Sequence, residues 1–572
     1  MLAVKLIQLR TAALLVSFAA VAGGACKKID EEWRSRYERS ARADIDLYLV
    51  PDRYAVLESS WLKKTAVARF NKEDLAKALA TYGRKLDDLR GNPAYEYKED
   101  GQEVKMKVGR ISHSTAYEYD TAIPISFFGK WFPPQQSYVT AYQQHIAPTL
   151  AQILGIRKPR GSEVNPLPTY NEYKTRPEII VVAVIDQGGM GLLETHKAVT
   201  PRISALMARS ANFKNSVVGH LDAHTAVGHM AIGTGAFPAQ SSVIGNTFFK
   251  LEKREGKQNL RKDEIYAVKD ETQVTNEQLK SETLGDVLNE VNGGRSVIIA
   301  QSYALRAAIG MGGHGSQPGG ANAPAITANN FIYWLDAARS KWVTDKRYYS
   351  LPKAVSGSDV LGAYKSGYPG GFEGYKIANA KDAVENWGLM MSTPVETKLE
   401  GELIRKVIRD EIIDKKKHAD GFTDLVYVSF KSADAVGHHF GYHSLEARET
   451  LAAIDKEIGA LEDFLKKEYG DRFALVLTAD HGCAPLSEIS GGARLTVEEV
   501  IAAIDSLLPP EVAANESLVR FMTVGQVSLN HELMEKHNIK LSAIEAKIMD
   551  IKPEGKKFFR MVLTRKDIGL GG

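Results

Sequence analysis

Carboxylates and imidazoles at the ends of apolar segments form a candidate metal site. Asp186 ends the segment VVAVID, Asp434 and His438 lie in SADAVGH after DLVYVSF, and Asp480 and His481 end FALVLTADH. Taken singly, an Asp after a strand is an ordinary turn or helix cap. Together, these residues are expected to lie close to one another in the fold and to bind metal, because carboxylates and imidazoles are common zinc ligands.

One further candidate ligand and a candidate nucleophile lie elsewhere. His113 stands in the polar segment ISHSTAYEYD, and Thr225 stands in LDAHTAVGHM, where a helix is expected to begin. From its own segment, Thr225 is a helix N-cap. A hydroxyl at a helix start also faces free N–H groups and the positive dipole end, which favour a bound phosphate. Three carboxylates and three imidazoles make up two three-ligand sets, which suit two zinc ions with open positions.

This set would serve an in-line displacement at phosphorus. Two metal ions roughly 4 Å apart can clamp the attacking and leaving oxygens. One ion would lower the pKa of the Thr225 hydroxyl, and the other would stabilise the leaving oxygen and later activate water. Asn246 and Arg306 are candidates to hold the non-bridging phosphate oxygens.

The elements that must position these residues follow an α/β pattern from residue 178 onward. Apolar strands are predicted at 178–186, 295–300, 424–430 and 473–480, and helices at 200–211, 281–291, 396–412 and 445–470. Ligands of open α/β sheets bind at the carboxyl ends of the strands, where the candidate residues stand. Residues 315–395, rich in Gly and Tyr, are expected to fold as an insertion over that edge.

The first third of the chain mixes both kinds of element. Strands are predicted at 44–50 and 123–128, a mostly helical segment at 55–88, a hairpin at 96–109, and a helix at 146–156.

Composition narrows the class of protein. The net charge is +3, and no Lys/Arg run interleaves with aromatic residues, so no nucleic-acid polymer is expected as a partner. Lys5 and Arg10 precede the apolar run TAALLVSFAAVAGGA, which predicts a signal peptide at 1–25 and an exported protein. Cys26 follows this run and resembles a lipoprotein processing site. Two alternatives follow: simple cleavage that releases the protein into the bacterial periplasm, or a lipid anchor at Cys26 that holds it on a membrane facing the periplasm.

Together these segments resemble the alkaline phosphatase superfamily, in the branch of threonine-nucleophile alkaline phosphatases and nucleotide pyrophosphatase/phosphodiesterases. VVAVIDQ resembles the first metal strand, HTAVGHMAIGTGAFPAQSSVIGN the nucleophile segment, SADAVGHHFGYHSLE the D-x-x-G-H-x-x-G segment, and LTADHG the D-H-G segment. The resemblance implies Asp186, Thr225, Asp480 and His481 around one zinc, and Asp434, His438 and a third histidine around the other. It implies a three-layer sandwich with a central, mostly parallel sheet covered by helices on both faces, plus an inserted cap region.

The order of the segments departs from the family. The third histidine normally lies near the C-terminus, whereas here the matching segments HSTAYEYDTAIPISFFG and IAPTLAQILGI come early. We therefore expect a circular permutation, with new termini between Gly572 and roughly Ala41. It predicts that His113 lies beside Asp434 and His438, and that strand 44–50 is central to the same sheet.

The resemblance also divides the chain into segments. These are the signal peptide 1–25, a permuted segment 27–165 that matches the C-terminal part of the family core, a core segment 171–250 with the first metal Asp and the nucleophile, a core strand with a cap-like insertion at 251–395, and a core segment 396–572 with the second metal segment and Asp-His-Gly.

A second departure concerns the phosphate site. Phosphomonoesterases of this branch carry a Lys-x-Arg pair, and in the matching SYALRAAIG Arg306 fits the arginine while Ala304 replaces the lysine. The leading hypothesis is a phosphomonoesterase that acts on small-molecule phosphate esters through a phosphothreonine at a two-zinc site. The alternative, favoured by the missing cation, is a phosphodiesterase or nucleotide pyrophosphatase, and an inactive binding relative is a third reading.

Overall fold

The computed structural model describes residues 31–568. It leaves out residue 43, the segments 170–174, 316–328, 337–339 and 370–386, and short stretches between residues 249 and 277. The expected signal peptide and Cys26 lie outside these residues. Within the described part of the chain, no helix is both long and apolar enough to cross a membrane.

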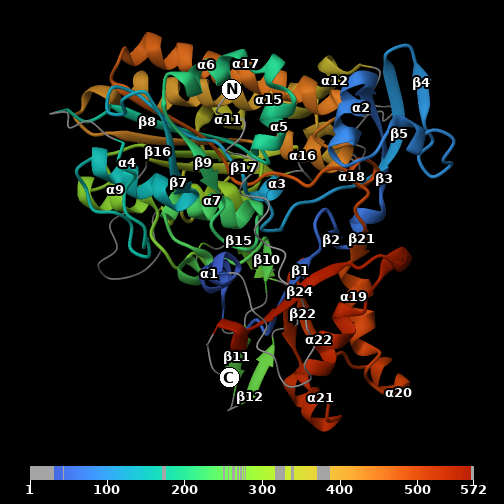
Figure 1. The fold of residues 1–572 in the computed structure, drawn as a ribbon. Helices are drawn as coiled ribbons and strands as arrows, with labels where there is room; N and C mark the ends of the chain where they lie inside the picture. The colour runs from blue at the N-terminus through green and yellow to red at the C-terminus, as the bar shows by residue number, and fades with distance from the viewer. Residues whose placement is uncertain are drawn as a thin grey trace, which may run out of the picture.

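A nine-stranded sheet forms the centre of the molecule (Figure 1). Its strands, in spatial order, are β18 (Lys341–Val343), β17 (Asn330–Asp336), β16 (Ile298–Ser302), β19 (Asp424–Phe430), β8 (Ile179–Ile185), β20 (Phe473–Ala479), β6 (Ile125–Phe128), β9 (Ala211–Val217) and β7 (Gln135–Tyr142). Strand β8 pairs in parallel with β19 and β20, whereas β6 and β18 run antiparallel to their neighbours. Every residue of β8 is buried, as its unbroken apolar sequence predicts for a central parallel strand.

Helices cover both faces of this sheet. Side chains of a strand alternate between faces, and Val181 and Ala183 of β8 pack into one core while Val182 and Val184 pack into the other. The first core lies under α6 (Pro201–Ala208), α15 (Pro394–Ile408), α16 (Ser432–Phe440) and α17 (Leu445–Tyr469). The second lies under α4 (Ile146–Ile153), α7 (Thr225–Thr234), α9 (Leu284–Asn292) and α10 (Leu305–Gly312). The predicted three-layer, mostly parallel α/β architecture is confirmed.

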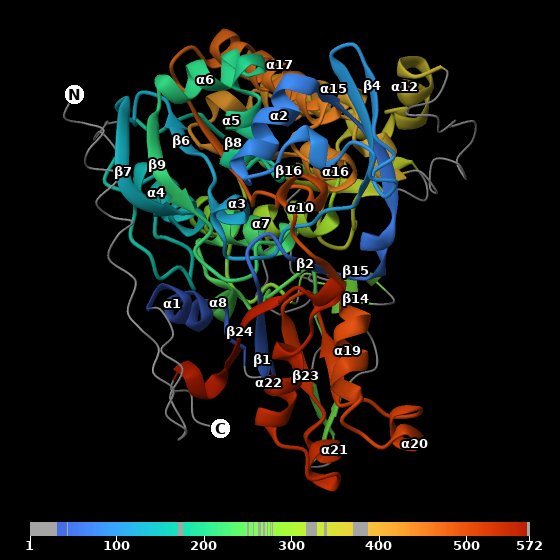
Figure 2. The same ribbon diagram turned by 45° about the vertical axis from the view of Figure 1, so that its right-hand side comes forward.

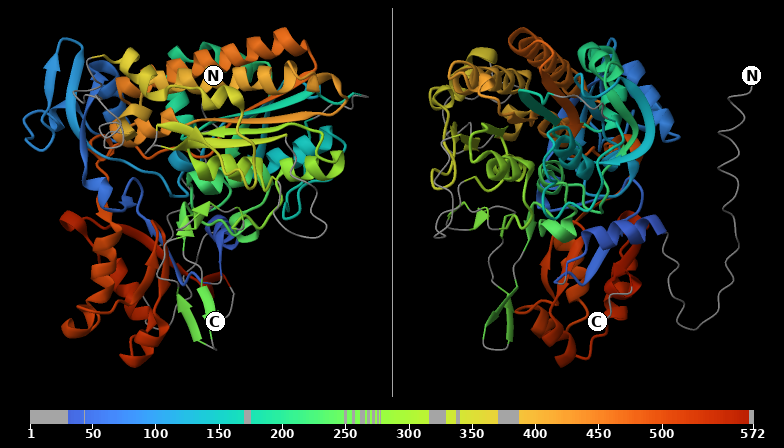
Figure 3. Two further views of the ribbon diagram at one scale, coloured as in Figure 1. Left: turned by 180° about the vertical axis from the view of Figure 1, so that it is seen from behind. Right: turned by 90° about the vertical axis from the view of Figure 1, so that its left-hand side faces the viewer.

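A second, smaller α/β unit lies beside the main body (Figures 1 and 2). Its sheet has the order β22 (Val519–Met522), β23 (Gln526–Leu529), β1 (Leu47–Pro51) and β24 (Phe559–Thr564). It packs on helices α19 (Val497–Asp505), α21 (His531–Lys536) and α22 (Leu541–Met549) and has its own apolar core. Figure 3 shows from behind how this unit projects from the main body.

Strand 44–50 therefore lies in a different sheet from the one predicted. The strand does form, as β1, but it fills an inner position of the smaller sheet rather than of the central one. Its backbone pairs antiparallel with both β23 and β24, and Leu47 lies opposite Thr564 near the other end of the chain. All five residues of β1 are buried, which suits an inner position of either sheet, so the sequence pattern alone could not choose between them.

The segment 55–88, predicted to be mostly helical, contributes one strand, β3 (Thr65–Asn71), to a three-stranded sheet. The order of this sheet is β3, β5 (Glu103–Gly109) and β4 (Lys98–Asp100), and β4 and β5 form the predicted hairpin. The helix, α2 (Lys72–Thr81), is shorter than predicted because Asn71 caps its start by accepting hydrogen bonds from the amides of Glu73 and Asp74. The alternating residues TAVARFN before this cap pair with β5 as a strand.

The expected insertion at 315–395 contributes to the sheet instead of only covering it. The apolar run NFIYWLD forms β17, which pairs in parallel with β16, and β18 extends the edge. Helices α11 (Lys353–Ser356) and α12 (Val360–Gly367) pack on α15. The prediction of a cap is therefore wrong for residues 330–343, because a fully apolar strand gains more by pairing inside the sheet than by lying over its edge.

The remaining elements are short. They comprise α1 (Glu31–Ser40), β2 (Val56–Glu58), α3 (Glu118–Thr121), α5 (Met190–Thr195), α8 (Pro238–Ser241), β10 (Thr247–Phe248), β11 (Leu251–Arg254), β12 (Lys257–Leu260), β13 (Ile265–Tyr266), β14 (Lys269–Asp270), β15 (Gln273–Val274), α14 (Trp387–Met391), α18 (Ser487–Ser490), β21 (Arg494–Thr496) and α20 (Pro510–Ala513).

Candidate metal centre

Three neighbouring strands deliver five of the predicted ligands to one edge of the sheet. Asp186 follows β8, Asp480 and His481 follow β20, and Asp434 and His438 lie on α16, which begins just after β19. Because β19, β8 and β20 are parallel neighbours, their carboxyl ends meet at the same edge.

Thr225 lies at the start of α7, over this edge. The helix begins at Thr225, and His224 holds the N-cap position without a side-chain capping bond. Thr225 is therefore not the N-cap residue. Its side chain is buried, and Oγ1 lies 3.5 Å from His481 Nε2. The hydroxyl consequently faces the candidate ligands.

Asp186, Asp480 and His481 form the first ligand group, with ligand atoms within 4.8 Å of one another. His481 Nε2 lies 3.1 Å from Asp480 Oδ2 and 3.9 Å from Asp186 Oδ1. Among the described residues, Asp186 Oδ1 has no hydrogen-bond partner, and Asp480 Oδ2 faces the imidazole nitrogens of His481 and His229. A buried carboxylate oxygen in the state of Asp186 Oδ1 fits metal coordination, because burial without a partner is otherwise costly.

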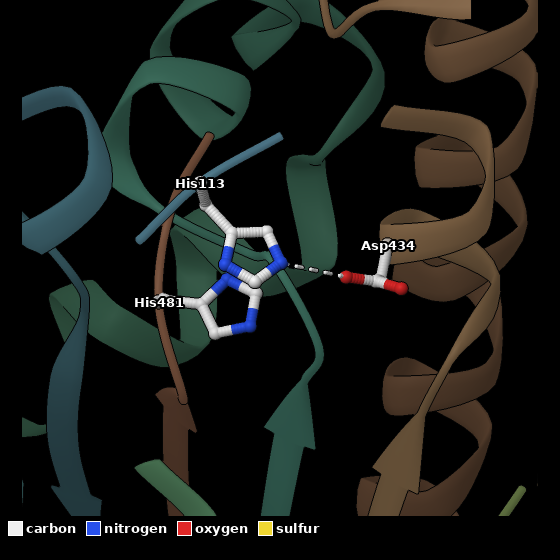
Figure 4. A group of neighbouring side chains, drawn as sticks. All are labelled: His113, Asp434 and His481. Carbon is white, nitrogen blue, oxygen red and sulfur yellow. Dashed lines mark ion pairs between the residues drawn. The ribbon is translucent and has the colours of Figure 1, made fainter. Parts of the chain in front are cut away.

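His113, Asp434 and His481 form the second group (Figure 4). His113 Nε2 lies 3.6 Å from Asp434 Oδ1, and His438 Nε2 lies 3.3 Å from the same oxygen. The Nδ1 atoms of His113 and His438 face the carbonyl oxygens of Ala223 and Ile111, at 2.5 and 2.7 Å, so both rings turn Nε2 towards Asp434. His113 thus lies beside Asp434 and His438, where it was predicted to lie.

Burial and neighbouring charges set the protonation of these groups. Burial, helped by His481, lowers the pKa of His113 well below its usual value, so its imidazole is neutral and able to bind a metal. Burial and Asp480 raise the pKa of Asp186 to about 7. Burial opposes ionisation of Asp480, but His481 and His229 outweigh it and hold the pKa of Asp480 well below its usual value. Asp480 in turn outweighs burial and raises the pKa of His481 to about 9.

The predicted phosphate ligands lie together near Thr225. Asn246 Oδ1 accepts hydrogen bonds from the amide of Ala226 and from Arg306 Nε, both at 2.9 Å. Arg306 stands in the first turn of α10, and Ala304 holds the N-cap position of that helix. A cavity of about 510 Å³ opens here. Its lining includes His113, His224, Asn246, Arg306, Lys431, Asp434 and His438, with Glu58, Trp61 and Arg110 among the other residues.

Lys431 is a site residue that the sequence interpretation missed. Its buried ammonium donates to Asp186 Oδ2 at 3.0 Å and lies 2.6 Å from Asp434 Oδ2 and 3.3 Å from Thr225 Oγ1. Burial acts to lower the pKa of Lys431, but Asp186 and Asp434 outweigh it and raise that pKa. A lysine directly after a fully buried strand, three residues before a ligand, was the available signal.

Supporting contacts surround the ligands. Gln187 donates to Asp434 Oδ1 at 3.2 Å, and its backbone amide donates to Asp480 Oδ1 at 2.9 Å. His229 Nδ1 lies 3.3 Å from Asp480 Oδ2 and faces the Thr225 carbonyl oxygen at 2.8 Å. These partners fix the ligand orientations.

His314 and Cys483 make other contacts. The two ring nitrogens of His314 face Asp286 and the carbonyl oxygen of Leu279, each at 2.8 Å, and His314 is not among the residues that line the cavity. Cys483 is buried, which raises the pKa of its thiol well above the usual value, as expected for a packing residue.

Several known proteins are similar to this chain in sequence. The chain is 24% identical over 412 residues to a protein named calcium-transporting ATPase from Myroides odoratus, a match that covers 64% of this chain and 72% of that one. It is 28% identical over 381 residues to alkaline phosphatase PhoV from Synechococcus elongatus, covering 58% and 64%. The chain thus spans just under two thirds of the length of PhoV.

Structure comparison adds evidence on the fold alone. Wild-type alkaline phosphatase PafA superposes with a TM-score of 0.51 at 20% identity, covering 66% of this chain and 77% of that one. A family model described as type I phosphodiesterase / nucleotide pyrophosphatase matches residues 180–568, which include five of the six predicted metal ligands and Thr225. Since this match covers well over half of the sequence, the chain belongs to the type I phosphodiesterase / nucleotide pyrophosphatase family, within the alkaline phosphatase superfamily.

Proposed function

We propose that this protein is a metal-dependent phosphate-ester hydrolase of the alkaline phosphatase type, a phosphomonoesterase that acts on small-molecule phosphate esters through a phosphothreonine intermediate. The observation that carries the proposal is the position of Thr225, whose buried hydroxyl faces His481, the residue common to both ligand groups. The family match and the alkaline phosphatase relatives support the same reaction class.

The donor set fits two zinc ions. Asp186, Asp480 and His481, together with Thr225, would hold one ion. Asp434, with His438 and His113 at 3.3 and 3.6 Å from its Oδ1, would hold the other. Nitrogen and carboxylate ligands without thiolates suit zinc in a hydrolytic site. When bound, such ions act as Lewis acids towards phosphoryl oxygens and make hydroxide available near neutral pH.

The side chains of the site then divide the work of two displacements. Thr225 Oγ1, after giving its proton to solvent, bonds to phosphorus as the bond to the leaving oxygen breaks, and the leaving group takes up a proton from solvent. Asn246 and Arg306 orient the non-bridging oxygens, since their hydrogen bond fixes both side chains beside the start of α7. Water then attacks phosphorus, and the bond to Thr225 Oγ1 breaks to release phosphate and restore the hydroxyl.

A phosphodiesterase or nucleotide pyrophosphatase is the second candidate. The description of the family model and the alanine at position 304 favour it, because a diester carries one negative charge fewer than a monoester dianion. An inactive binding relative is a third, weaker candidate.

Zinc content and relative turnover test these proposals. Two zinc ions per chain after purification and complete loss of turnover in Thr225→Ala are expected. A chain that retains no zinc, or an active Thr225→Ala variant, contradicts the proposal. Hydrolysis of a bis-aryl phosphate diester about tenfold faster than an aryl phosphate, or about 1.4 kcal/mol in barrier, would establish the second candidate.

We also propose the circular permutation and the segment boundaries that it implies. The antiparallel pairing of β1 with β24 supports it, because the hairpin expected from an unpermuted chain would join these two strands directly. The family match starts at residue 180 and leaves out the segment that contains His113. Linking residues 45 and 568 and opening the chain between 165 and 175 should yield a folded, zinc-binding protein, and an insoluble product would argue against the permutation.

Export is the remaining proposal. The segment 1–25 is proposed as a signal peptide, with either simple cleavage or a lipid anchor at Cys26. Mass spectrometry of the protein purified from cells distinguishes the two, because acylation of the Cys26 thiol adds a defined mass. An N-terminus that still begins at Met1 would contradict both.

A further inference from the structure

We propose that Lys431 supplies the phosphate-site cation that Ala304 does not, and that it thereby directs the site towards dianionic phosphate monoesters. This inference rests on the proposed function and names the substrate class of that site. It replaces the expectation that the chain lacks a second cation beside its phosphate.

The ammonium of Lys431 lies next to the proposed nucleophile. Nζ is 3.3 Å from Thr225 Oγ1, and the residue is only 5% exposed, so its charge is directed into the site. Lys431 also lines the same cavity as Asn246 and Arg306. A phosphoryl group bonded to Thr225 Oγ1 would bring its oxygens within hydrogen-bond reach of this ammonium, which has three donors to offer.

Lys431 does not contact the carboxylate oxygens that face the imidazoles. It contacts Oδ2 of both Asp186 and Asp434, at 3.0 and 2.6 Å. The other oxygen of each carboxylate faces a histidine instead, since Asp186 Oδ1 lies 3.9 Å from His481 Nε2 and Asp434 Oδ1 lies 3.3 Å from His438 Nε2. The ammonium therefore occupies one oxygen of each carboxylate and leaves the other oxygen facing the imidazoles, where a metal ion would bind.

The cation reaches this position from a different element. Ala304 starts α10, whereas Lys431 sits at the turn between β19 and α16. Both elements border one cavity, so a positive charge can be delivered to the same space from either. A fixed buried cation stabilises a dianionic phosphoryl group more than a monoanionic one, because the attraction grows with the charge of the ligand.

The test compares Lys431→Met and Lys431→Arg with the wild-type protein, all loaded with zinc. Lys398→Met serves as the matched control, because Lys398 lies on the surface of α15 with 67% of its side chain exposed. Zinc content, calorimetric binding of inorganic phosphate, and kcat/KM for an aryl phosphate and a bis-aryl phosphate diester are measured on each.

We expect Lys431→Met to keep its zinc, to bind phosphate about tenfold or more weakly, and to lose at least as much monoester kcat/KM while diester hydrolysis changes much less. Lys431→Arg should recover part of both losses, and Lys398→Met should match the wild type.

Three results would overturn the proposal: unchanged phosphate affinity in Lys431→Met, equal losses on both esters, or a change of zinc content in either direction. Additional zinc in Lys431→Met would show that the ammonium takes the place of a metal ion. Failure of the proposed function is distinguishable, because a wild type that hydrolyses neither ester can still show Lys431-dependent phosphate binding.

Discussion

A single methyl group added at Gly228 should move Thr225 away from the proposed metal ligand Asp480. Gly228 lies on α7, one turn after Thr225, and faces the end of β20. A Cβ at this position would lie 2.5 Å from the carbonyl oxygen of Asp480 and 2.8 Å from its Cβ. Because these atoms belong to the backbone and the Cβ of Asp480, a proposed metal ligand, no flexible side-chain end can move aside.

The size of the effect follows from this contact. Ordinary contacts at such a site begin near 3.4 Å, so α7 and the Asp480 segment must separate by roughly 1 Å. A misplacement of about 1 Å in a reacting group can lower a rate by about 10²-fold. Overpacking costs about 1–3 kcal/mol, while replacing Gly by Ala inside a helix gains about 1 kcal/mol. Gly228→Ala should therefore lose far more turnover than stability.

Steady-state hydrolysis of an aryl phosphate, thermal unfolding and zinc content test this together. Gly233→Ala is the matched control on the same helix, because its Cβ would lie 2.3 Å from the carbonyl oxygen of Gly310, which is on the α10 side and away from Asp480. The control should be destabilised while keeping most of its turnover. Wild-type kcat in Gly228→Ala, or equal loss of turnover in both variants, would refute the reasoning.

Three further predictions concern other parts of the molecule. His113→Ala should retain about one zinc per chain instead of two, since one of two ligand groups stays complete, and elemental analysis showing two retained ions would exclude His113 as a ligand. Burial raises the pKa of Asp424 to about 8, above the 3.8 of the ordinary group. The folded chain therefore binds more protons than the unfolded chain between these values, and stability should fall as pH rises from about 4 to about 8. Asp424→Asn keeps an oxygen that can accept the 2.7 Å hydrogen bond from the amide of Val297. The difference in urea midpoint, variant minus wild type, should therefore be larger at pH 8 than at pH 5, and an equal difference at both pH values would contradict this. Arg69→Met on β3 removes the guanidinium that lies 2.8 Å from the buried Glu446 of α17, while the backbone amide of residue 69 still donates to that carboxylate, so it should cost about 1.5–3 kcal/mol in unfolding free energy at pH 8. A loss below about 1 kcal/mol would show that Glu446 is simply protonated.

Local patterns predicted the central elements because those elements are determined locally. The continuous apolar runs that became β8, β19 and β20 allow only a strand buried on both faces, and the residues at their ends then meet at one edge. The first ligand group and its neighbour on α16 could be predicted for this reason, even though nearly 300 residues separate Asp186 from Asp480.

Choices among partners were not readable from local pattern. Strand β1 is buried along its whole length, which suits an inner position of any sheet, and only the structure shows that β23 and β24 are its neighbours. Residues 65–71 carry alternating side chains beside a good helix, and their pairing with β5 depends on a hairpin some 35 residues away. In each case the deciding contact is long-range, and period and propensity do not encode it.

Lys431 shows the same limit within the site itself. The family motif has a lysine two positions before the arginine, and Ala304 stands at that position here, so the sequence alone predicts a missing positive charge. The substrate would experience only where positive charge lies relative to Thr225 Oγ1, and an ammonium 3.3 Å away meets that requirement from another element. In the same way, His113 lies 3.6 Å from Asp434 although more than 300 residues separate the two in the sequence. Because the sheet edge is a meeting point for many chain segments, a site of this kind can keep its chemistry while the sequence positions that supply it change.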